Sequence, residues 1–278
     1  MFNINPLKTF ERKAKLEDYF HENIMEKRNF KCQLYDQCKN SQNGLFFEGQ
    51  SHYLGNYYDI QNNGIPFRIA VIGQEYGGGP PFVTLTERSI HVLGSAFQSY
   101  FNKNYKDINR SFRNSHMKGT TSILRLLFGK GLGTNWEDEF ITLENGRLIH
   151  VFEAFALTNY LLCSAVTSKN SRRGCSSKVM RNNCSNHFKS VMDIIEPNII
   201  IVQSKTYWHY IVYNFSHLNK IDEVIYKTKI NDSTGYLLRL CHPAANGKLN
   251  WGNNEKTEYL INVIAPAINN LKKIIGVI

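Results

Sequence analysis

The sequence lacks any run of about 18 apolar residues, which is the length that a membrane-spanning helix requires. The first twenty residues, MFNINPLKTFERKAKLEDYF, also lack the apolar core of a secretory signal peptide. From these two absences we expect a cytoplasmic protein that is not inserted in a membrane.

Two kinds of motif are missing as well. Neither glycine-rich phosphate-binding pattern, GxGxxG or GxxxxGK[ST], occurs in the chain. The six cysteines contain no CxxC pair of the zinc-ribbon type. In a reducing compartment disulfides are a poor explanation for so many cysteines, so buried free thiols and a metal site remain as alternatives. The cysteines are Cys32, Cys38, Cys163, Cys175, Cys184 and Cys241.

Acidic residues are scarce relative to basic ones. The chain has 33 Lys and Arg against 23 Asp and Glu, which gives a net charge of +10. Such a surplus favours a polyanionic partner, with nucleic acid first and an anionic membrane second. The simpler alternative is a basic surface without a partner.

A chain of 278 residues is long enough for one large α/β domain. Apolar strand-like runs alternate with segments of helical periodicity, and this alternation favours a layered fold with parallel strands. The strand-like runs are 66–74, 148–164, 196–204, 221–228 and 235–242. The expected helices are 8–28, 86–101, 120–128, 176–195, 205–215 and 255–275, the last of them kinked or broken near Pro266.

Polar side chains follow three of these expected strands. They form the pairs Gln74-Glu75, Thr158-Asn159 and His242-Pro243. In parallel sheets the ligand site lies outside the carboxyl ends of the strands. We therefore expect the three pairs to meet at one edge of the sheet.

Each of these positions has a structural and a functional interpretation. Glu75 in GQEYGGGPPF could position a water molecule and Phe82 could support a flat ligand, or the segment is an ordinary surface turn. The amide of Asn159 could read the polar edge of a base, or it could cap a turn. His242 could be a catalytic electrophile or a turn residue.

Taken in order, these motifs resemble the uracil-DNA glycosylase superfamily, nearest its iron–sulfur-containing branch. The resemblance covers roughly residues 30–250. It is carried by the pair Cys32 and Cys38, GQEYG (73–77), PFV (81–83), TNYLLC (158–163), Cys184 before an apolar strand, and HPAA (242–245).

The resemblance implies a role for each matched residue. Asn159 would contact the polar edge of a flipped-out base, and Phe82 would stack on the base. His242 would donate a hydrogen bond to the carbonyl oxygen on which negative charge develops. Glu75 would orient the attacking water, and Gln74 would contribute its backbone to the base pocket. The spacing of this carboxylate is similar to the GQDPY of classical uracil-DNA glycosylases, with Glu in place of Asp.

The resemblance also implies a fold: a three-layer α/β/α arrangement around a mainly parallel central sheet of about four strands. We expect a single domain over residues 1–278, with an N-terminal helical, cysteine-bearing extension over about 1–63. A monomer is expected.

The iron–sulfur branch further implies a cofactor. Four dispersed thiolates can hold a [4Fe–4S] cluster. The expected ligands are Cys32, Cys38, Cys163 and Cys184, with Cys175 as a substitute and with zinc or no metal as alternatives. The first pair has the spacing Cx5C, where the family usually has CxxC.

These implications predict a monofunctional DNA glycosylase that hydrolyses the N-glycosidic bond of a flipped-out pyrimidine. Uracil is the default base, and a modified cytosine, as in antiviral defence, is the main variant. Lys248, Arg172 and Arg173 are candidate phosphate contacts, and Leu249 is a candidate for filling the vacated stack; solvated loops are the alternative. The competing functions are a catalytically weak DNA-binding or damage-sensing protein and a small-molecule N-glycosidase.

Overall fold

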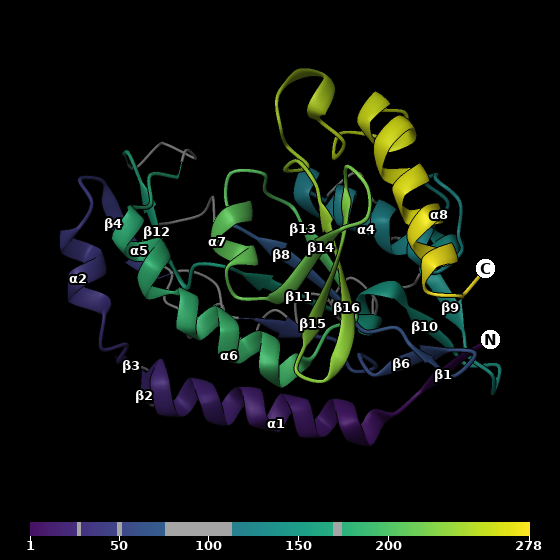
Figure 1. Ribbon diagram of the computed structural model, residues 1–278, viewed down its shortest axis with the longest axis horizontal. Coiled ribbons are helices and arrows are strands. Elements are labelled where there is room, and N and C mark those ends of the chain that lie inside the picture. Colours follow the sequence, from purple (N-terminus) through teal and green to yellow (C-terminus); the bar gives the residue numbers. More distant parts are fainter. Residues whose placement is uncertain (27–28, 49–51, 76–112, 169–173) are drawn as a thin grey trace.

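The computed structural model describes residues 1–26, 29–48, 52–75, 113–168 and 174–278. A seven-stranded sheet forms the centre of the molecule, with the strand order β14-β15-β16-β13-β8-β11-β5 (Figure 1). The predicted helix 86–101 lies outside the described residues. None of the described helices is long and apolar enough to cross a membrane.

Four adjacent strands in the middle of this sheet run parallel to one another. They are β16 (Ser233–Arg239), β13 (Ile199–Val202), β8 (Ile69–Gly73) and β11 (Phe155–Asn159). The inner strands β8 and β13 are buried along their whole length, which explains their continuous apolar sequences IAVIG and IIIV. Parallel pairing brings the carboxyl ends of these strands to one edge of the sheet.

Antiparallel strands complete the sheet at both edges. β5 (Tyr53–Leu54) pairs with β11, while β15 (Ile225–Ile230) pairs with β16 and with β14 (Ser216–Lys220). β15 alternates buried and exposed residues, as expected where one face of a strand meets water. The predicted α/β class is confirmed, but the sheet is mixed and has seven strands where about four were expected.

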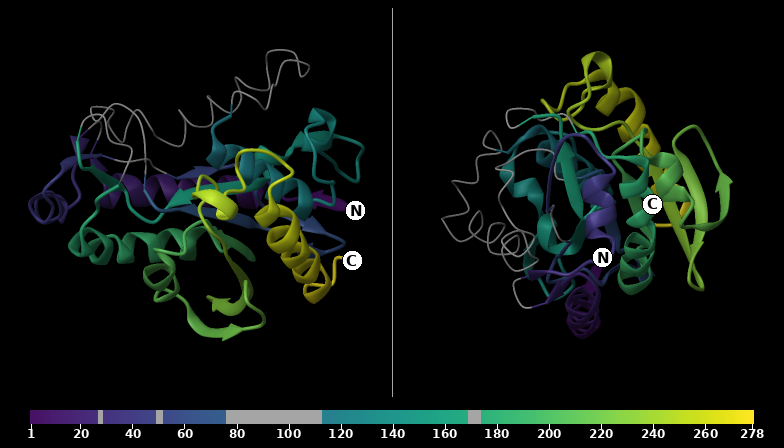
Figure 2. Two further views of the ribbon diagram at one scale, coloured as in Figure 1. Left: turned by 90° about the horizontal axis from the view of Figure 1, so that it is seen from above. Right: turned by 90° about the vertical axis from the view of Figure 1, so that its left-hand side faces the viewer.

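Two hydrophobic cores cover the two faces of the sheet. Successive residues of β8 alternate between them: Ile69 and Val71 belong to one core, and Ala70 and Ile72 to the other. The first core contains α4 (Ser115–Leu127), the turn Leu260–Ile264 and α8 (Ala265–Ile274). The second core contains α1 (Pro6–Asn23), α5 (Lys178–Asn183), α6 (Ser185–Ile195) and α7 (Trp208–Val212). Figure 2 shows these helices from two further directions.

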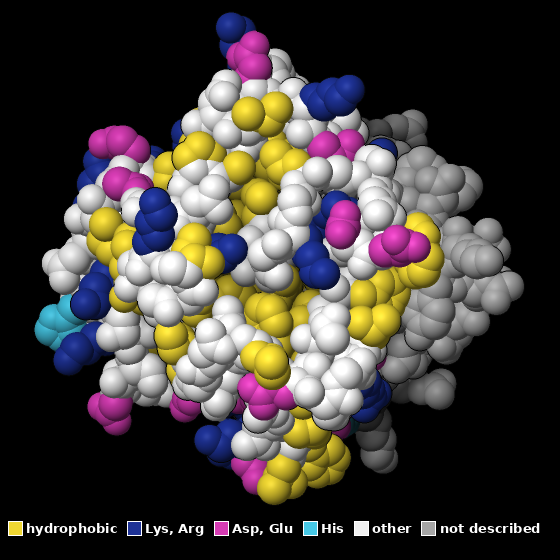
Figure 3. Space-filling model, turned by 90° about the vertical axis from the view of Figure 1, so that its right-hand side faces the viewer, with side chains coloured by type: hydrophobic (Ala, Val, Ile, Leu, Met, Phe, Trp, Pro, Cys, Tyr) yellow, Lys and Arg dark blue, Asp and Glu magenta, His cyan; other side chains and the backbone are white. Residues whose placement is uncertain are grey.

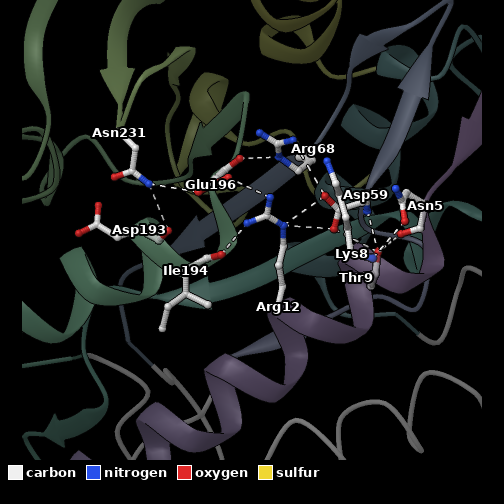
Figure 4. A network of polar contacts seen from close by, with 10 residues as sticks. All are labelled: Asn5, Lys8, Thr9, Arg12, Asp59, Arg68, Asp193, Ile194, Glu196 and Asn231. Atoms are coloured by element: carbon white, nitrogen blue, oxygen red, sulfur yellow. Dashed lines mark hydrogen bonds and ion pairs between the residues drawn. The ribbon is translucent and has the colours of Figure 1, made fainter.

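The N-terminal helix α1 packs along α6 and is fixed by a network of ion pairs (Figures 1 and 4). The Arg12 guanidinium contacts Asp59 at 3.1 Å and Glu196 at 2.9 Å, and it donates to the carbonyl oxygen of Ile194 at 2.7 Å. Arg68 donates to the Glu196 carbonyl oxygen at 2.6 Å. These contacts join α1 to the sheet and to the end of α6.

Smaller elements occupy segments that the sequence analysis treated as loops or as longer elements. The predicted loop 30–63 contains α2 (Tyr35–Asn40), β4 (Leu45–Glu48), β5 and β6 (Ile60–Asn62). The apolar run 148–164 contains the expected central strand, β11, together with β10 (Leu148–His150), a 3-10 turn (Val151–Ala154) and the start of β12 (Cys163–Val166). The other short elements are β1 (Phe2–Ile4), β2 (Met25–Glu26), β3 (Asn29–Phe30), β7 (Ile65–Pro66), β9 (Phe140–Thr142) and the 3-10 turns Trp136–Glu139 and Gly247–Leu249.

The C-terminal helix is continuous but irregular near Pro266, where a kink or a break was predicted. A π-helical segment, Leu260–Ile264, precedes α8, and Pro266 is the second residue of α8. Proline has no N–H and collides with the carbonyl group of the preceding turn, so a widened turn before it relieves the clash.

The surface that carries the two chain ends has a mixed composition. On this face basic, acidic and hydrophobic side chains are interspersed (Figure 3). The net charge of +10 is therefore not gathered here.

Candidate active site

The topology of the sheet places a switch point at the carboxyl ends of β8 and β13, which is where open α/β sheets form a ligand crevice. Of the later strands that join this sheet, the first in the chain is β11, which lies on one side of β8; the second is β13, which lies on the other. Connections that leave in opposite directions create a switch point, where ligands bind in open α/β sheets. Gln74 follows β8 and Ser204 follows β13, and the Gln74 side chain donates to the Ser204 hydroxyl at 2.7 Å.

Asn159 lies directly over Gly73 in this crevice. The two residues are register partners on β11 and β8, and a Cβ atom added to Gly73 would be 2.4 Å from Asn159 Oδ1. Only glycine leaves room for the amide at this position. The backbone N–H of Tyr160 donates to the Gly73 carbonyl oxygen at 3.1 Å and holds the strand end in place.

His242 stands on a rigid loop that follows β16. The Ala244 N–H donates to His242 Nδ1 at 3.1 Å, and the N–H groups of Trp251 and Gly252 donate to the Pro243 carbonyl oxygen. Because Nδ1 accepts a hydrogen bond, the neutral ring carries its proton on Nε2. The loop therefore presents His242 as a hydrogen-bond donor.

A second histidine, His116 in the first turn of α4, lies against His242. The two rings stack with centroids 5.8 Å apart and an interplanar angle of 27°. His116 Nε2 lies 3.9 Å from the Cβ position of Gly73, close to the Asn159 amide. We call Gly73, His116, Asn159, Gln203 and His242 the strand-end site.

Sequence reasoning missed His116. None of the motifs includes this residue, and 126 positions separate the two histidines. The sequence feature that could have indicated this contact is a pair of small residues, which let α4 approach the loop that carries His242. A Cβ on Gly119 would lie 2.8 Å from Trp251, and one on Gly252 would lie 2.0 Å from the Ser115 carbonyl oxygen.

Both histidines are neutral at neutral pH. Burial and the neighbouring His242 lower the pKa of His116 to about 4, although Gln203 partly offsets this effect. Burial also lowers the pKa of His242. The strand-end site therefore contains neutral donors and acceptors.

Glu75 occupies a separate pocket beside β12. The Ala165 N–H donates to its carboxylate at 3.4 Å, and a Cβ on Gly174 would be 2.3 Å from Glu75 Oε1. Burial raises the pKa of Glu75 to about 7, while the Ala165 N–H, Ser176 and Arg181 act in the opposite direction. The contacts of Glu75 are thus with β12 and the segment from Gly174, rather than with Asn159 or His242.

Lys248 and Leu249 lie at the surface of the loop that carries His242. Both belong to the 3-10 turn Gly247–Leu249, and Leu249 is 45% exposed. Lys248 Nζ is 3.8 Å from a Glu258 carboxylate oxygen. The predicted site residues Phe82, Arg172 and Arg173 lie outside the described residues.

The four predicted cysteine ligands lie near one another on different elements. Burial raises the pKa of Cys163, and negative charge on Cys184, Cys32 and Cys38 would raise it further. All six cysteines are free thiols. Within the described ranges, however, no three Cys, His, Asp or Glu side chains are arranged to hold a metal ion.

The other two cysteines lie elsewhere. Cys175 lies near Glu75, whose charge contributes to the raised pKa of this thiol, and Cys241 belongs to the core on the opposite face of the sheet. Near the first group, His187 Nε2 is 3.6 Å from Cys32 Sγ, and Asn183 donates to Cys38 Sγ at 3.4 Å.

Comparison with known proteins gives no family assignment. No protein-family model matches this chain, and no curated protein matches it. The resemblance to uracil-DNA glycosylases therefore stays a hypothesis from motifs. The function has to be argued from the geometry of the strand-end site.

Proposed function

We propose that this protein is a monofunctional DNA glycosylase that hydrolyses the N-glycosidic bond of a flipped-out pyrimidine and leaves an abasic site. The observation that carries the proposal is that His242, a neutral donor, stacks on His116, whose Nε2 lies with the Asn159 amide around Gly73 at the switch point of the sheet. Uracil is the default base, and a modified cytosine is the variant.

His242 supplies what the departing base needs. As the N-glycosidic bond breaks, negative charge develops on the base, and a donor aimed at that charge stabilises the transition state more than the ground state. The Ala244 N–H fixes the ring tautomer, so Nε2–H is available for this bond. One such donor contributes about 3–4 kcal/mol.

Asn159 supplies the group that recognises the base. Its amide carries both donors and an acceptor, which can pair with the polar edge of a flipped pyrimidine. Gly73 makes room for the amide, and the backbone of β11 and β8 holds it at a fixed height above the sheet. Gln74 lies at the base of the same crevice through its bond to Ser204.

The Glu75 carboxyl group is the proposed water-orienting group. With a pKa of about 7 it titrates in the range where a general base is effective. It faces β12 in this conformation, so the proposal requires the carboxylate to turn toward the substrate when DNA binds.

DNA contacts are proposed for the exposed part of the same loop. Lys248 would neutralise a backbone phosphate, and Leu249 would fill the gap left by the flipped nucleotide. Both side chains are exposed and close in sequence to His242. Arg172 and Arg173 are proposed as further phosphate contacts from the sequence alone.

A structural metal group is proposed for Cys32, Cys38, Cys163 and Cys184. Their donor chemistry fits an iron–sulfur cluster, and zinc is the alternative. Side chains would have to rotate, because the present arrangement does not hold a metal ion. The group would cross-link α2, β12 and the junction between α5 and α6, and it takes no part in the hydrolysis.

Metal analysis of cysteine variants tests this assignment. We expect Cys184→Ser to lose the metal and the broad absorbance near about 400 nm. The matched control Cys175→Ser should keep both, since Cys175 lies near Glu75 instead. Equal metal content in both variants, or a metal-free wild-type protein prepared without oxygen, would contradict the assignment.

One observation favours a second candidate function, a catalytically weak DNA-binding or damage-sensing protein. The contacts of Glu75 are with β12 and Gly174, away from the two histidines. If the carboxylate never turns, binding would persist while hydrolysis would be slow. This candidate predicts DNA affinity that is unaffected by Glu75→Gln and the absence of measurable base release.

A panel of oligonucleotides tests the primary proposal. Single- and double-stranded DNA with uracil, hypoxanthine or glucosylated hydroxymethylcytosine is incubated with the protein and then treated with alkali, which cleaves abasic sites. We expect scission at one of these bases. Salt-dependent binding to every oligonucleotide without scission would favour the second candidate.

A further inference from the structure

His116 is a side chain of the strand-end site to which the motifs assign no role. It belongs to α4, while the other polar groups of the site follow strands of the sheet. Its ring is in contact with His242 and its Nε2 lies near Asn159. The question is what a second histidine does at this position.

The position of His116 is itself fixed by a buried amide. Gln203, which follows β13, is fully buried and donates to the Thr120 hydroxyl at 3.1 Å. Thr120 lies one turn after His116 on the same face of α4. The Gln203 side chain also raises the pKa of His116, although its buried oxygen Oε1 has no hydrogen-bond partner among the described residues.

His242 is held by hydrogen bonds within its own loop. Its Nδ1 accepts from Ala244, and its carbonyl oxygen accepts from the Ala245 N–H at 2.9 Å. Among the described residues none forms a hydrogen bond with Nε2. The ring is therefore fixed at one nitrogen by its own loop and on one face by His116.

From this arrangement we propose that His116 is a positioning residue, which holds the ring of His242 by stacking so that its Nε2–H points into the crevice. Gln203 and Thr120 support His116, and His116 supports His242. One hydrogen bond to Nδ1 does not by itself prevent the His242 side chain from rotating. The packing of the His116 ring against it limits this rotation. A preorganised donor avoids reorganisation during the reaction.

The surrounding groups agree with this role. Gln203 and Asn159 are uncharged, and among the described residues His242 is the titratable group whose charge lowers the pKa of His116. Stacked imidazoles repel when both are charged, so the pair is stable as two neutral rings. The packing of Gly119 and Gly252 keeps α4 and the loop close enough for the rings to meet.

Three variants separate stacking from hydrogen bonding. His116→Phe keeps a flat ring against His242, His116→Asn keeps a polar group near Gln203, and His116→Ala removes both. The exposed His209 provides a matched control, His209→Ala. All are studied as the full-length chain.

The first readout is the imidazole ¹⁵N spectrum of His242 at neutral pH, which does not require catalysis. We expect a single Nε2–H form in the wild type, in His116→Phe and in His209→Ala. In His116→Ala and His116→Asn we expect averaged shifts from a mobile ring. An unchanged His242 spectrum in folded His116→Ala would overturn the proposal.

The second readout depends on the proposed function. For the cleaved oligonucleotide, we expect kcat of His116→Ala to fall at least about tenfold with KM little changed, and His116→Phe to recover most of it. Loss in His116→Phe equal to that in His116→Ala would contradict a stacking role. A wild-type protein that releases no base would overturn the proposed function, while the ¹⁵N spectra would still decide the role of His116.

Discussion

Glu75 and the His116–His242 pair lie at the same edge of the sheet, yet burial acts on them in opposite directions. The carboxyl group has its pKa raised to about 7, and His116 has its pKa lowered to about 4. In both pockets burial disfavours the charged form. At this edge of the sheet burial therefore favours the neutral form of both kinds of group, which is the protonated carboxyl group of Glu75 and the uncharged imidazole rings of the histidines.

The largest expected effect concerns how stability depends on pH around Glu75. In the unfolded chain Glu75 titrates at about 4.5 and in the folded protein at about 7, so the folded state binds the proton more tightly. Its contribution is fully present below pH 4.5 and is lost as the pH rises through 7, a difference of about 3 kcal/mol. Urea unfolding at pH 5 and pH 8 should show this loss in the wild type and a flatter profile in Glu75→Gln.

The contribution of the histidine pair to stability should change with pH in the opposite direction. The pKa of His116 falls from 6.5 in the unfolded chain to about 4, so its contribution is present above pH 6.5 and is lost as the pH falls through 4. The expected loss in the free energy of unfolding is at most about 3 kcal/mol, because part of the His116 surface remains exposed to solvent. Unfolding of His116→Phe between pH 7 and pH 4 should lack this loss. If the free energy of unfolding depended on pH in the same way in Glu75→Gln and in His116→Phe, the opposite effects of burial on the two groups would be contradicted.

The contact between Gly73 and Asn159 gives a smaller effect. A Cβ atom on Gly73 would displace the amide, whereas one on Gly131 meets nothing within 4 Å. We expect Gly73→Ala to lose about 1–3 kcal/mol of stability and to bind the target base more weakly. Gly131→Ala is the matched control, and equal thermal midpoints for the two variants would show that Asn159 does not lie over Gly73.

The smallest expected effect is at the surface. Lys248 is exposed, so Lys248→Ala should leave stability unchanged and weaken DNA binding at low salt. Loss of one phosphate contact lowers the slope of log K against log salt by about one. Lys205→Ala, at another exposed lysine, serves as the control. An identical slope in wild type and Lys248→Ala would remove Lys248 from the DNA contacts.

The sequence predicted the parts of the site that follow strands. The apolar run 66–74 became β8, and Asn159 and His242 follow strands as expected. Their meeting could be anticipated because parallel strands bring their carboxyl ends together.

The sequence did not predict contacts that depend on packing between distant elements. His116 reaches the site because α4 packs against the loop from Pro243 to Gly252, and Glu75 turns away because Gly174 leaves a pocket for it. The antiparallel strand β14 escaped prediction because its sequence SHLNK is mostly polar, and β5 escaped because it has only two residues. Local periodicity carries no information on such contacts.

The most direct test of the central claim is the rate at which free base leaves an oligonucleotide, measured by chromatography for wild type and His242→Ala. The account predicts base release by the wild type and a decrease of about 10²–10³-fold in His242→Ala, with unchanged DNA affinity. Equal rates of base release in the two proteins, or no release by the wild type from any base of the panel, would contradict it.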